Sequence, residues 1–195
     1  MFWTLEYIGH ENIRVLNGGW NAWEAAELQT TGKTQEIEAS DYPIQLESDK
    51  IADLEQVLDR LYDPDVILVD ARSPQEYRGE VSFSERAGHI PGAVNLVWLD
   101  ALTGGDAVFT TESNWPARLR DEDVEVFKQA SEIETMLQDL EIPRNKQIIT
   151  YCQTLWRGAH VYFLFRLMDY EDVRGYDGSW AEWGMYNDLK VETGE

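Results

Sequence analysis

Cysteine is almost absent from this chain, which has a single one, Cys152, among 195 residues. One thiol excludes an internal disulfide framework, a CxxC redox pair and a set of thiolates for structural zinc. Histidine is also scarce, and His10, His89 and His160 are scattered without the spacing of metal ligands. We therefore expect no metal and no organic cofactor, and a reducing, cytoplasmic environment.

Basic residues are also few in this sequence. Its 16 Lys and Arg residues stand against 37 Asp and Glu, which gives a net charge of -21. This balance argues against partners such as nucleic acid or an anionic membrane surface, because both need a basic footprint. Only five of the basic residues are lysines, so adaptation of the surface to a salty cytoplasm is a further hypothesis.

Long apolar runs are missing as well. No stretch approaches the roughly 18 residues that a membrane span requires. The first residues, MFWTLE, have neither the basic start nor the small-residue cleavage site of a secretory signal. The sequence therefore predicts a protein without a membrane partner.

What the sequence does contain is an internal repeat. Residues 7–23 and 167–183 match at a constant offset of 160, and the matched positions include Asn17-Gly18 with Asp177-Gly178, Trp20 with Trp180, and Trp23 with Trp183. The offset approximates one domain length. We therefore predict that residues 1–36 are the remnant of a first domain whose larger part is missing, that 37–46 form a linker, and that 47–190 form a complete catalytic domain. The alternative is that residues 1–36 have been kept for another purpose.

Strand-like and helix-like segments alternate after the linker. The apolar runs 66–69, 93–96 and 147–151 are typical of buried parallel strands. Helices are predicted from a cap at Ser48 or Asp49 to Leu61, over 122–140 and over 158–168. The alternation predicts an α/β fold: an open parallel sheet flanked by helices on both faces, with a partial N-terminal repeat.

Cys152 directly follows the predicted strand 147–151, and a short loop then leads to Arg157 and a helix. Ligands of open α/β sheets bind beyond the carboxyl ends of strands, where helix N-termini present free N–H groups. A thiol in this place is biased toward the reactive thiolate, and Arg157 adds a formal positive charge. The competing interpretation is an inert packing cysteine.

Three segments carry a family resemblance: LVDARSPQEYRG at 68–79, GHIPGAVN at 88–95, and CQTLWR at 152–157 with GSWAEW at 178–183. The chain resembles the rhodaneses, specifically the tandem-domain thiosulfate sulfurtransferases, over residues 45–187. Residues 1–36 resemble the end of that family's first domain. The resemblance implies that Cys152 takes the outer sulfur of thiosulfate as a persulfide. The sulfur would then pass to a thiophilic small molecule, such as cyanide or a thiol.

The resemblance also implies a set of site residues. The loop around the sulfur donor is formed by Gln153, Thr154, Leu155, Trp156, Arg157 and Gly158. Arg78 and Arg86 are candidates for donor-binding charge, and Asp70 is a candidate for a hydrogen bond that supports the loop. His89 is interpreted as a structural hydrogen-bonding residue, and the tryptophans Trp180 and Trp183 as core anchors.

The length of the Cys152 loop, and the positions where its sequence differs from the family, distinguish between the possible activities. The spacing C-x4-R is the sulfurtransferase length, whereas the related phosphatases and arsenate reductases resemble C-x5-R. Leu155 and Trp156 replace two histidines of the bacterial CQTHHR type, which leaves Arg157 as the loop's only cation and suggests Trp156 as an apolar lid over the acceptor site. Glu76 stands where mercaptopyruvate-type relatives carry a substrate-binding arginine. The alternatives are a mercaptopyruvate-type or sulfur-relay transferase, a phosphatase or arsenate reductase, and a non-catalytic rhodanese-like interaction module.

Overall fold

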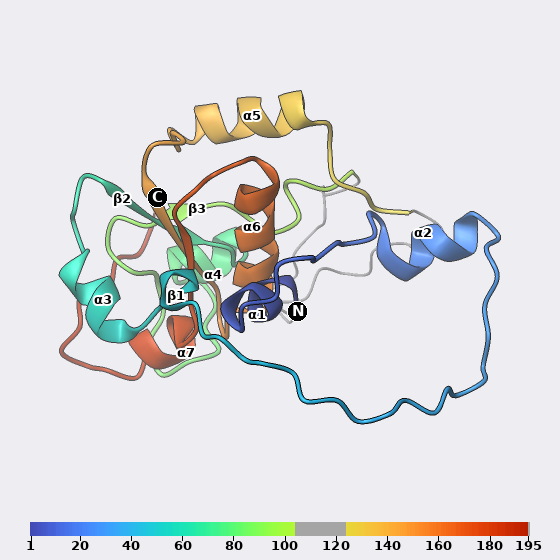
Figure 1. The fold of residues 1–195 in the computed structure, drawn as a ribbon. Coiled ribbons are helices and arrows are strands. Elements are labelled where there is room, and N and C mark those ends of the chain that lie inside the picture. Colours follow the sequence, from blue (N-terminus) through green and yellow to red (C-terminus); the bar gives the residue numbers. More distant parts are fainter. Residues whose placement is uncertain (104–123, 195) are drawn as a thin grey trace.

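The centre of the molecule is a parallel sheet of five strands in the order β1-β5-β4-β2-β3 (Figure 1). The computed structural model describes residues 1–103 and 124–194. The strands are β1 (Ile51–Ala52), β2 (Val66–Asp70), β3 (Val94–Asn95), β4 (Gln147–Tyr151) and β5 (Val173–Tyr176). All four pairings are parallel, and β4 lies between β5 and β2. The predicted α/β architecture is confirmed.

Helices cover both faces of the sheet. The helices are α1 (Phe2–Tyr7), α2 (Gly19–Ala25), α3 (Leu54–Asp59), α4 (Pro74–Arg78), α5 (Ala130–Asp139), α6 (Trp156–Leu167) and α7 (Ser179–Trp183), with a 3-10 turn over Ser48–Lys50. One buried cluster joins α5 and α6 to Val69 and Ile148 of the sheet. A second cluster joins α3 and α7 to the neighbouring strand residues Leu68 and Ile149. Successive strand side chains point to opposite faces, so the continuous apolar runs supply both cores.

Two helices begin later than the sequence predicts. Ile51 and Ala52 pair with β5, so α3 begins only after Asp53, whose capping box with Gln56 fixes the first turn. The predicted helix 122–140 is in fact the shorter α5, and Gln129 caps it through Glu132. The start of that prediction lies outside the described residues. The third helix begins two residues earlier than predicted, at Trp156.

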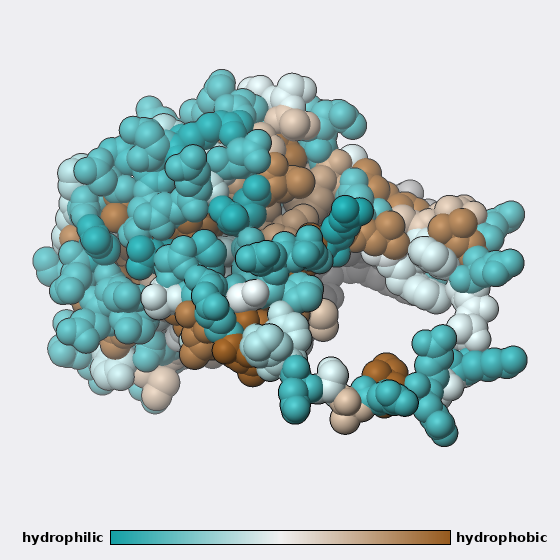
Figure 2. Space-filling view, in the orientation of Figure 1, coloured by the Kyte–Doolittle hydropathy of each residue, from teal (hydrophilic) through white to brown (hydrophobic). Residues whose placement is uncertain are grey.

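The N-terminal copy of the repeat lies beside the sheet and its helices and adds no strand to the sheet. Helix α1 packs on α6, where the rings of Phe2 and Phe163 lie 4.6 Å apart. Residues 13–16, all of them described, form no strand, and α2 has no buried residue. Residues 31–46 run as an exposed segment without secondary structure and leave an opening between α2 and the main body (Figures 1 and 2). Among the described residues, no helix is long and apolar enough to cross a membrane.

Candidate functional site

Cys152 lies where the sequence places it, immediately after the central strand β4 and before α6. It is 1% exposed and packs with the core cluster on the α6 side of the sheet. The loop turns into the helix at Leu155, which caps α6 in the left-handed conformation with φ 64°. The loop therefore lies at the carboxyl edge of the sheet, beside the free N–H groups and positive dipole end of a 12-residue helix.

The Cys152 loop is held from one side by Ser179. Its hydroxyl accepts hydrogen bonds from the backbone N–H of Leu155 at 2.9 Å and of Cys152 at 3.4 Å, and donates to the carbonyl of Tyr176 at 2.8 Å. The backbone N–H groups of Trp180 and Ala181 donate to the carbonyls of Cys152 and Gln153, each at 2.9 Å. The first turn of α7 thus fixes the loop's backbone.

The motif GSWAEW predicts the neighbouring tryptophans as core anchors, whereas the role of Ser179 is apparent only in the structure. Trp180 and Trp183 are both fully buried and anchor α7 in the core. The signal for Ser179 was its position inside the GSWAEW motif, directly after the turn that follows β5. Ser179 has φ 53°, a conformation that a non-glycine residue adopts only when its surroundings hold it there.

On the other side of the loop, Arg157 forms a buried ion pair with Glu76. Its Nη1 and Nη2 donate to the two carboxylate oxygens at 2.7 and 2.9 Å. Ser73 also donates to Glu76 through both its N–H and its hydroxyl, so the carboxylate is fully supplied with donors. The positive charge of the loop is therefore matched by a carboxylate from α4.

The pKa values of this pair follow from that geometry. Burial raises the pKa of Glu76, but the hydrogen bond and charge of Arg157 outweigh it, so the pKa lies below its usual value. Burial lowers the pKa of Arg157, whereas the hydrogen bond and charge of Glu76 raise it, and the net shift is upward. Both residues therefore remain ionised at neutral pH.

Asp70 supports the Cys152 loop through Arg72 and not by a direct hydrogen bond. Its carboxylate accepts from the guanidinium of Arg72, with the shortest contact 2.6 Å, and both side chains are buried. The described hydrogen bonds include none from the loop backbone to Asp70, so the predicted direct contact is replaced by an indirect one. Arg72 lies over the Trp180 ring at 4.6 Å and donates to the carbonyl of Gly88, which ties the GHIPGA segment to α7.

Arg78 and Arg86 have structural partners. Arg86 donates to the carbonyls of Tyr186 and Leu189, at 2.5 and 2.7 Å, and Arg78 pairs with Glu80 at 2.7 Å. These contacts leave their predicted role in binding a donor untested. His89 is buried, stacks on Tyr77 with the ring centroids 3.6 Å apart, and bonds the Tyr77 carbonyl through Nδ1.

The remaining loop residues differ in exposure. Gln153 donates to the hydroxyl of Ser84 at 2.8 Å, Thr154 is exposed, and Trp156 is 85% exposed. Gly158 is buried, and a Cβ there would lie 3.0 Å from the backbone of Tyr151, so glycine permits α6 to approach β4 closely. Thr154, Leu155 and Trp156 also line a cleft of about 700 Å³ between the loop and α1.

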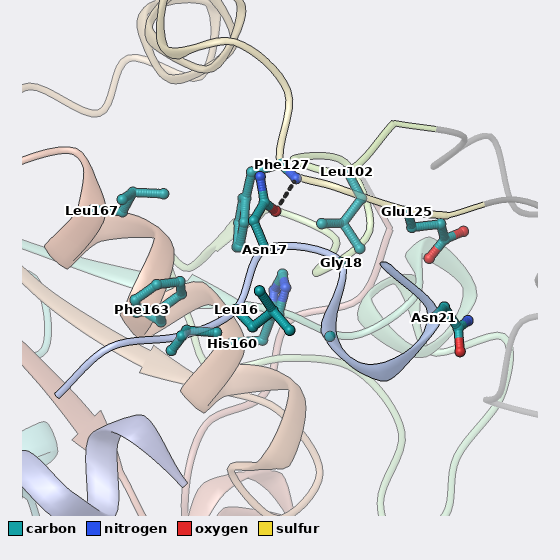
Figure 3. Close-up of a pocket in the computed structure, with 12 residues that line it drawn as sticks. Leu16, Asn17, Gly18, Asn21, Leu102, Glu125, Phe127, His160, Phe163 and Leu167 are labelled. Atoms are coloured by element: carbon teal, nitrogen blue, oxygen red, sulfur yellow. Dashed lines mark hydrogen bonds between the residues drawn. The ribbon is translucent and has the colours of Figure 1, made fainter. Parts of the chain in front are cut away.

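A second cavity, of about 410 Å³, lies between residues 15–21 and α6 (Figure 3). Phe127, which stacks on His160 at 5.1 Å, lines it, and the Phe127 N–H donates to Asn17 at 3.0 Å. Burial lowers the pKa of His160 to about 4, so this imidazole is neutral. None of the described residues that line this cavity belongs to the Cys152 loop. Among the described residues, no group of three or more His, Cys, Asp or Glu side chains could hold a metal ion.

Comparison with known proteins agrees with the family resemblance that the sequence motifs carry. The family model of the rhodanese-like domain matches residues 53–186. The chain is 35% identical over 190 residues to a thiosulfate sulfurtransferase of Azotobacter vinelandii, covering 97% of this chain and 63% of that one. It is 30% identical to the sulfur carrier protein TtuD of Thermus thermophilus, covering 100% of this chain and 66% of the relative. The chain therefore spans just under two thirds of the length of these relatives.

Solved structures extend the likeness to the fold. The anaerobic ergothioneine biosynthesis enzyme from Chlorobium limicola, in complex with trimethyl histidine, superposes with a TM-score of 0.79. It is 29% identical, and the match covers 99% of this chain and 44% of that one. A related structure, with a TM-score of 0.79 and 28% identity, holds ergothioneine covalently linked with a persulfide; the match covers 100% of this chain and 44% of that one.

Proposed function

The chain belongs to the rhodanese family, and from this premise we propose that it is a thiosulfate sulfurtransferase with Cys152 as its nucleophile. One observation carries the proposal. The only cysteine of the sequence lies directly after the central strand, in a backbone loop clamped by α7 and opening into the N-terminus of α6. Such a loop stabilises a thiolate and offers N–H donors to an oxyanion.

The proposed reaction has two displacement steps. The Cys152 thiolate attacks the outer sulfur of thiosulfate, and a new S–S bond forms while the S–S bond of thiosulfate breaks. Sulfite leaves with the bonding electron pair, and Cys152 retains the sulfur as a persulfide. Cyanide or a thiolate then attacks the outer sulfur, and the electron pair of the broken bond restores the Cys152 thiolate. No metal or organic cofactor takes part.

In the proposed mechanism the Cys152 loop binds the sulfur donor. The residues Gln153 to Gly158 surround the bound anion with backbone N–H groups. Arg157 gives two of its five N–H donors to Glu76 and keeps the others for the oxyanion. Arg78 and Arg86 are proposed to supply further donor-binding charge. The mercaptopyruvate alternative is less favoured, because Glu76 puts a carboxylate and not an arginine beside the loop.

We propose the same domain division that the repeat predicts. Residues 1–36 correspond to the end of a first rhodanese domain, residues 37–46 to a linker, and residues 47–190 to the catalytic domain. The mechanism also favours a reducing, cytoplasmic compartment, because thiolates and persulfides are readily oxidised. A sulfur-relay role is the second candidate, and the 30% identity to a sulfur carrier protein favours it.

The test is an assay with thiosulfate and cyanide that follows thiocyanate and sulfite. The native chain should form both products, and Cys152→Ser should form neither while its circular dichroism stays unchanged. Ser131→Ala, on the exposed start of α5, is the matched control and should keep full activity. A chain that forms no sulfite but hydrolyses an aryl phosphate would contradict the proposal in favour of a phosphatase. A folded chain with no turnover of either kind would favour an interaction module.

A further inference from the structure

A cleft of about 700 Å³ lies beside the Cys152 loop, and most of the described residues that line it lie outside the loop assigned to donor binding. Its walls come from two distant parts of the sequence: the loop and the start of α6 on one side, and α1 with the turn after β5 on the other. The described residues that line it are Met1, Trp3, Thr4, Leu5, Thr154, Leu155, Trp156, Ala159 and Asp177. A pocket of this size accommodates a small organic molecule.

Two tryptophans form the aromatic part of the cleft. Trp156 is the first residue of α6 and is 85% exposed, which is unusual for so large an apolar side chain beside a nucleophile. Trp3 belongs to α1, where its Nε1 donates to the carbonyl of Lys50 at 2.7 Å and its ring stacks on Tyr7. One tryptophan is thus exposed at the loop and the other is fixed in place opposite it.

The side chains that line the cleft carry a single charge, which is negative. Asp177, directly after β5, has the only charged side chain among the described residues that line it. The net charge of -21 for the whole chain adds to the negative potential at its surface. Indole faces attract cations through their quadrupole, and quaternary ammonium groups are a ligand that aromatic sites recognise. An anionic molecule would be repelled by the same cleft.

We infer that this cleft receives the sulfur acceptor and selects thiols that carry a quaternary ammonium group. The inference rests on the proposed function, since it assigns the second step of that reaction. The ammonium group lies against Trp156 and near Asp177. The acceptor thiolate forms an S–S bond with the outer sulfur of the persulfide, the bond to the Cys152 sulfur breaks, and its electron pair restores the Cys152 thiolate.

Three acceptors that share a two-carbon thiol test the assignment: thiocholine, which is cationic, 2-mercaptoethanol, which is neutral, and 2-mercaptoethanesulfonate, which is anionic. The quantity measured is the ratio of kcat/KM for thiocholine to kcat/KM for the sulfonate, with thiosulfate as donor. The variants are Asp177→Asn and Trp156→Ala, with Asp139→Asn on the exposed end of α5 as a control of equal charge change. Intrinsic differences in thiol reactivity cancel when this ratio is compared between variants.

The ratio should fall about three- to fivefold in each cleft variant, as expected for one cation–π or charge contact at an exposed site. It should stay unchanged in Asp139→Asn. The release of sulfite on loading with thiosulfate should be the same in Asp177→Asn and Asp139→Asn, because neither side chain belongs to the donor loop. Trp156 belongs to that loop, so Trp156→Ala is compared through the acceptor ratio alone. Unchanged ratios with normal sulfite release would overturn the acceptor assignment alone. Absence of sulfite from the native chain would instead overturn the proposed function.

Discussion

The two copies of the repeat have similar sequences and very different surroundings. Trp180 and Trp183 of the second copy are fully buried, whereas Trp20 of the first is 59% exposed. The second copy supplies β5, a strand paired on both sides, while residues 13–16 of the first copy pair with nothing in the described sheet. The same local pattern therefore makes a core only where strands and helices from elsewhere in the chain surround it.

The copies also differ at the position that holds the Cys152 loop. Ser179 in the second copy corresponds to Gly19 in the first, at the offset of 160. Only the serine can accept the N–H groups of the Cys152 loop. The residues that directly precede the two copies, Glu6 of α1 and Arg166 of α6, also match at the offset of 160 and form an ion pair at 3.4 Å.

Truncating a tryptophan in each copy should give the largest difference. Trp180→Ala removes a fully buried indole, and we expect a loss of about 3–5 kcal/mol in the free energy of unfolding. Trp20→Ala should change it by less than about 0.5 kcal/mol, because the side chain is mostly in solvent. Urea unfolding followed by circular dichroism measures both. Equal losses would show that Trp20 of the first copy is also buried in solution.

Replacing Glu76 tests the other support of the Cys152 loop. Glu76→Gln leaves the buried guanidinium of Arg157 without its counter-ion, and we expect a loss of about 3 kcal/mol at pH 7. Since the folded-state pKa of Glu76 is lowered, the native pair contributes fully above pH 4.5 and is lost as pH falls through the lowered pKa. The difference between native chain and variant in urea unfolding should therefore shrink at acid pH. A difference independent of pH would exclude an ionised pair.

Removing the Ser179 hydroxyl should have a smaller effect on stability and a specific effect on activity. Ser179→Ala leaves two loop N–H groups without an acceptor, at a cost of about 2 kcal/mol. The loosened loop should also slow sulfite release by roughly tenfold, because positioning of the nucleophile is lost. Stopped-flow loading with thiosulfate measures the rate. A variant that is destabilised but loads at the native rate would limit Ser179 to a structural role.

Breaking the ion pair between α1 and α6 should have the smallest effect on stability. Glu6→Gln removes the charge that pairs with Arg166, and the pair is partly exposed, so we expect a loss of about 1 kcal/mol or less. The hydrogen bond from Tyr162, at 2.6 Å, can still reach the amide oxygen. Unfolding curves and hydrogen exchange of α1 check the result. Complete loss of protection in α1 would mean that this pair alone holds the first copy in place.

Sequence alone determined the fold class and the place of Cys152. Both follow from local patterns: apolar runs of strand length, helices between them, and Cys152 at the end of one run. A residue directly after a buried parallel strand must lie at the carboxyl edge of the sheet, whatever the detailed packing. The resemblance to rhodaneses, carried by short motifs, pointed to the family that the match over residues 53–186 shows.

Only the tertiary structure decided how the loop is held. The partners of Arg157 and Cys152 are Glu76 and Ser179, which are 81 and 27 residues away along the chain. It likewise decided that Trp20 is exposed while Trp180 is buried, and that Trp3 and Trp156 share a cleft. The physical reason is the same in each case. Burial and ion pairing depend on which distant segments pack together, and local sequence does not specify those neighbours.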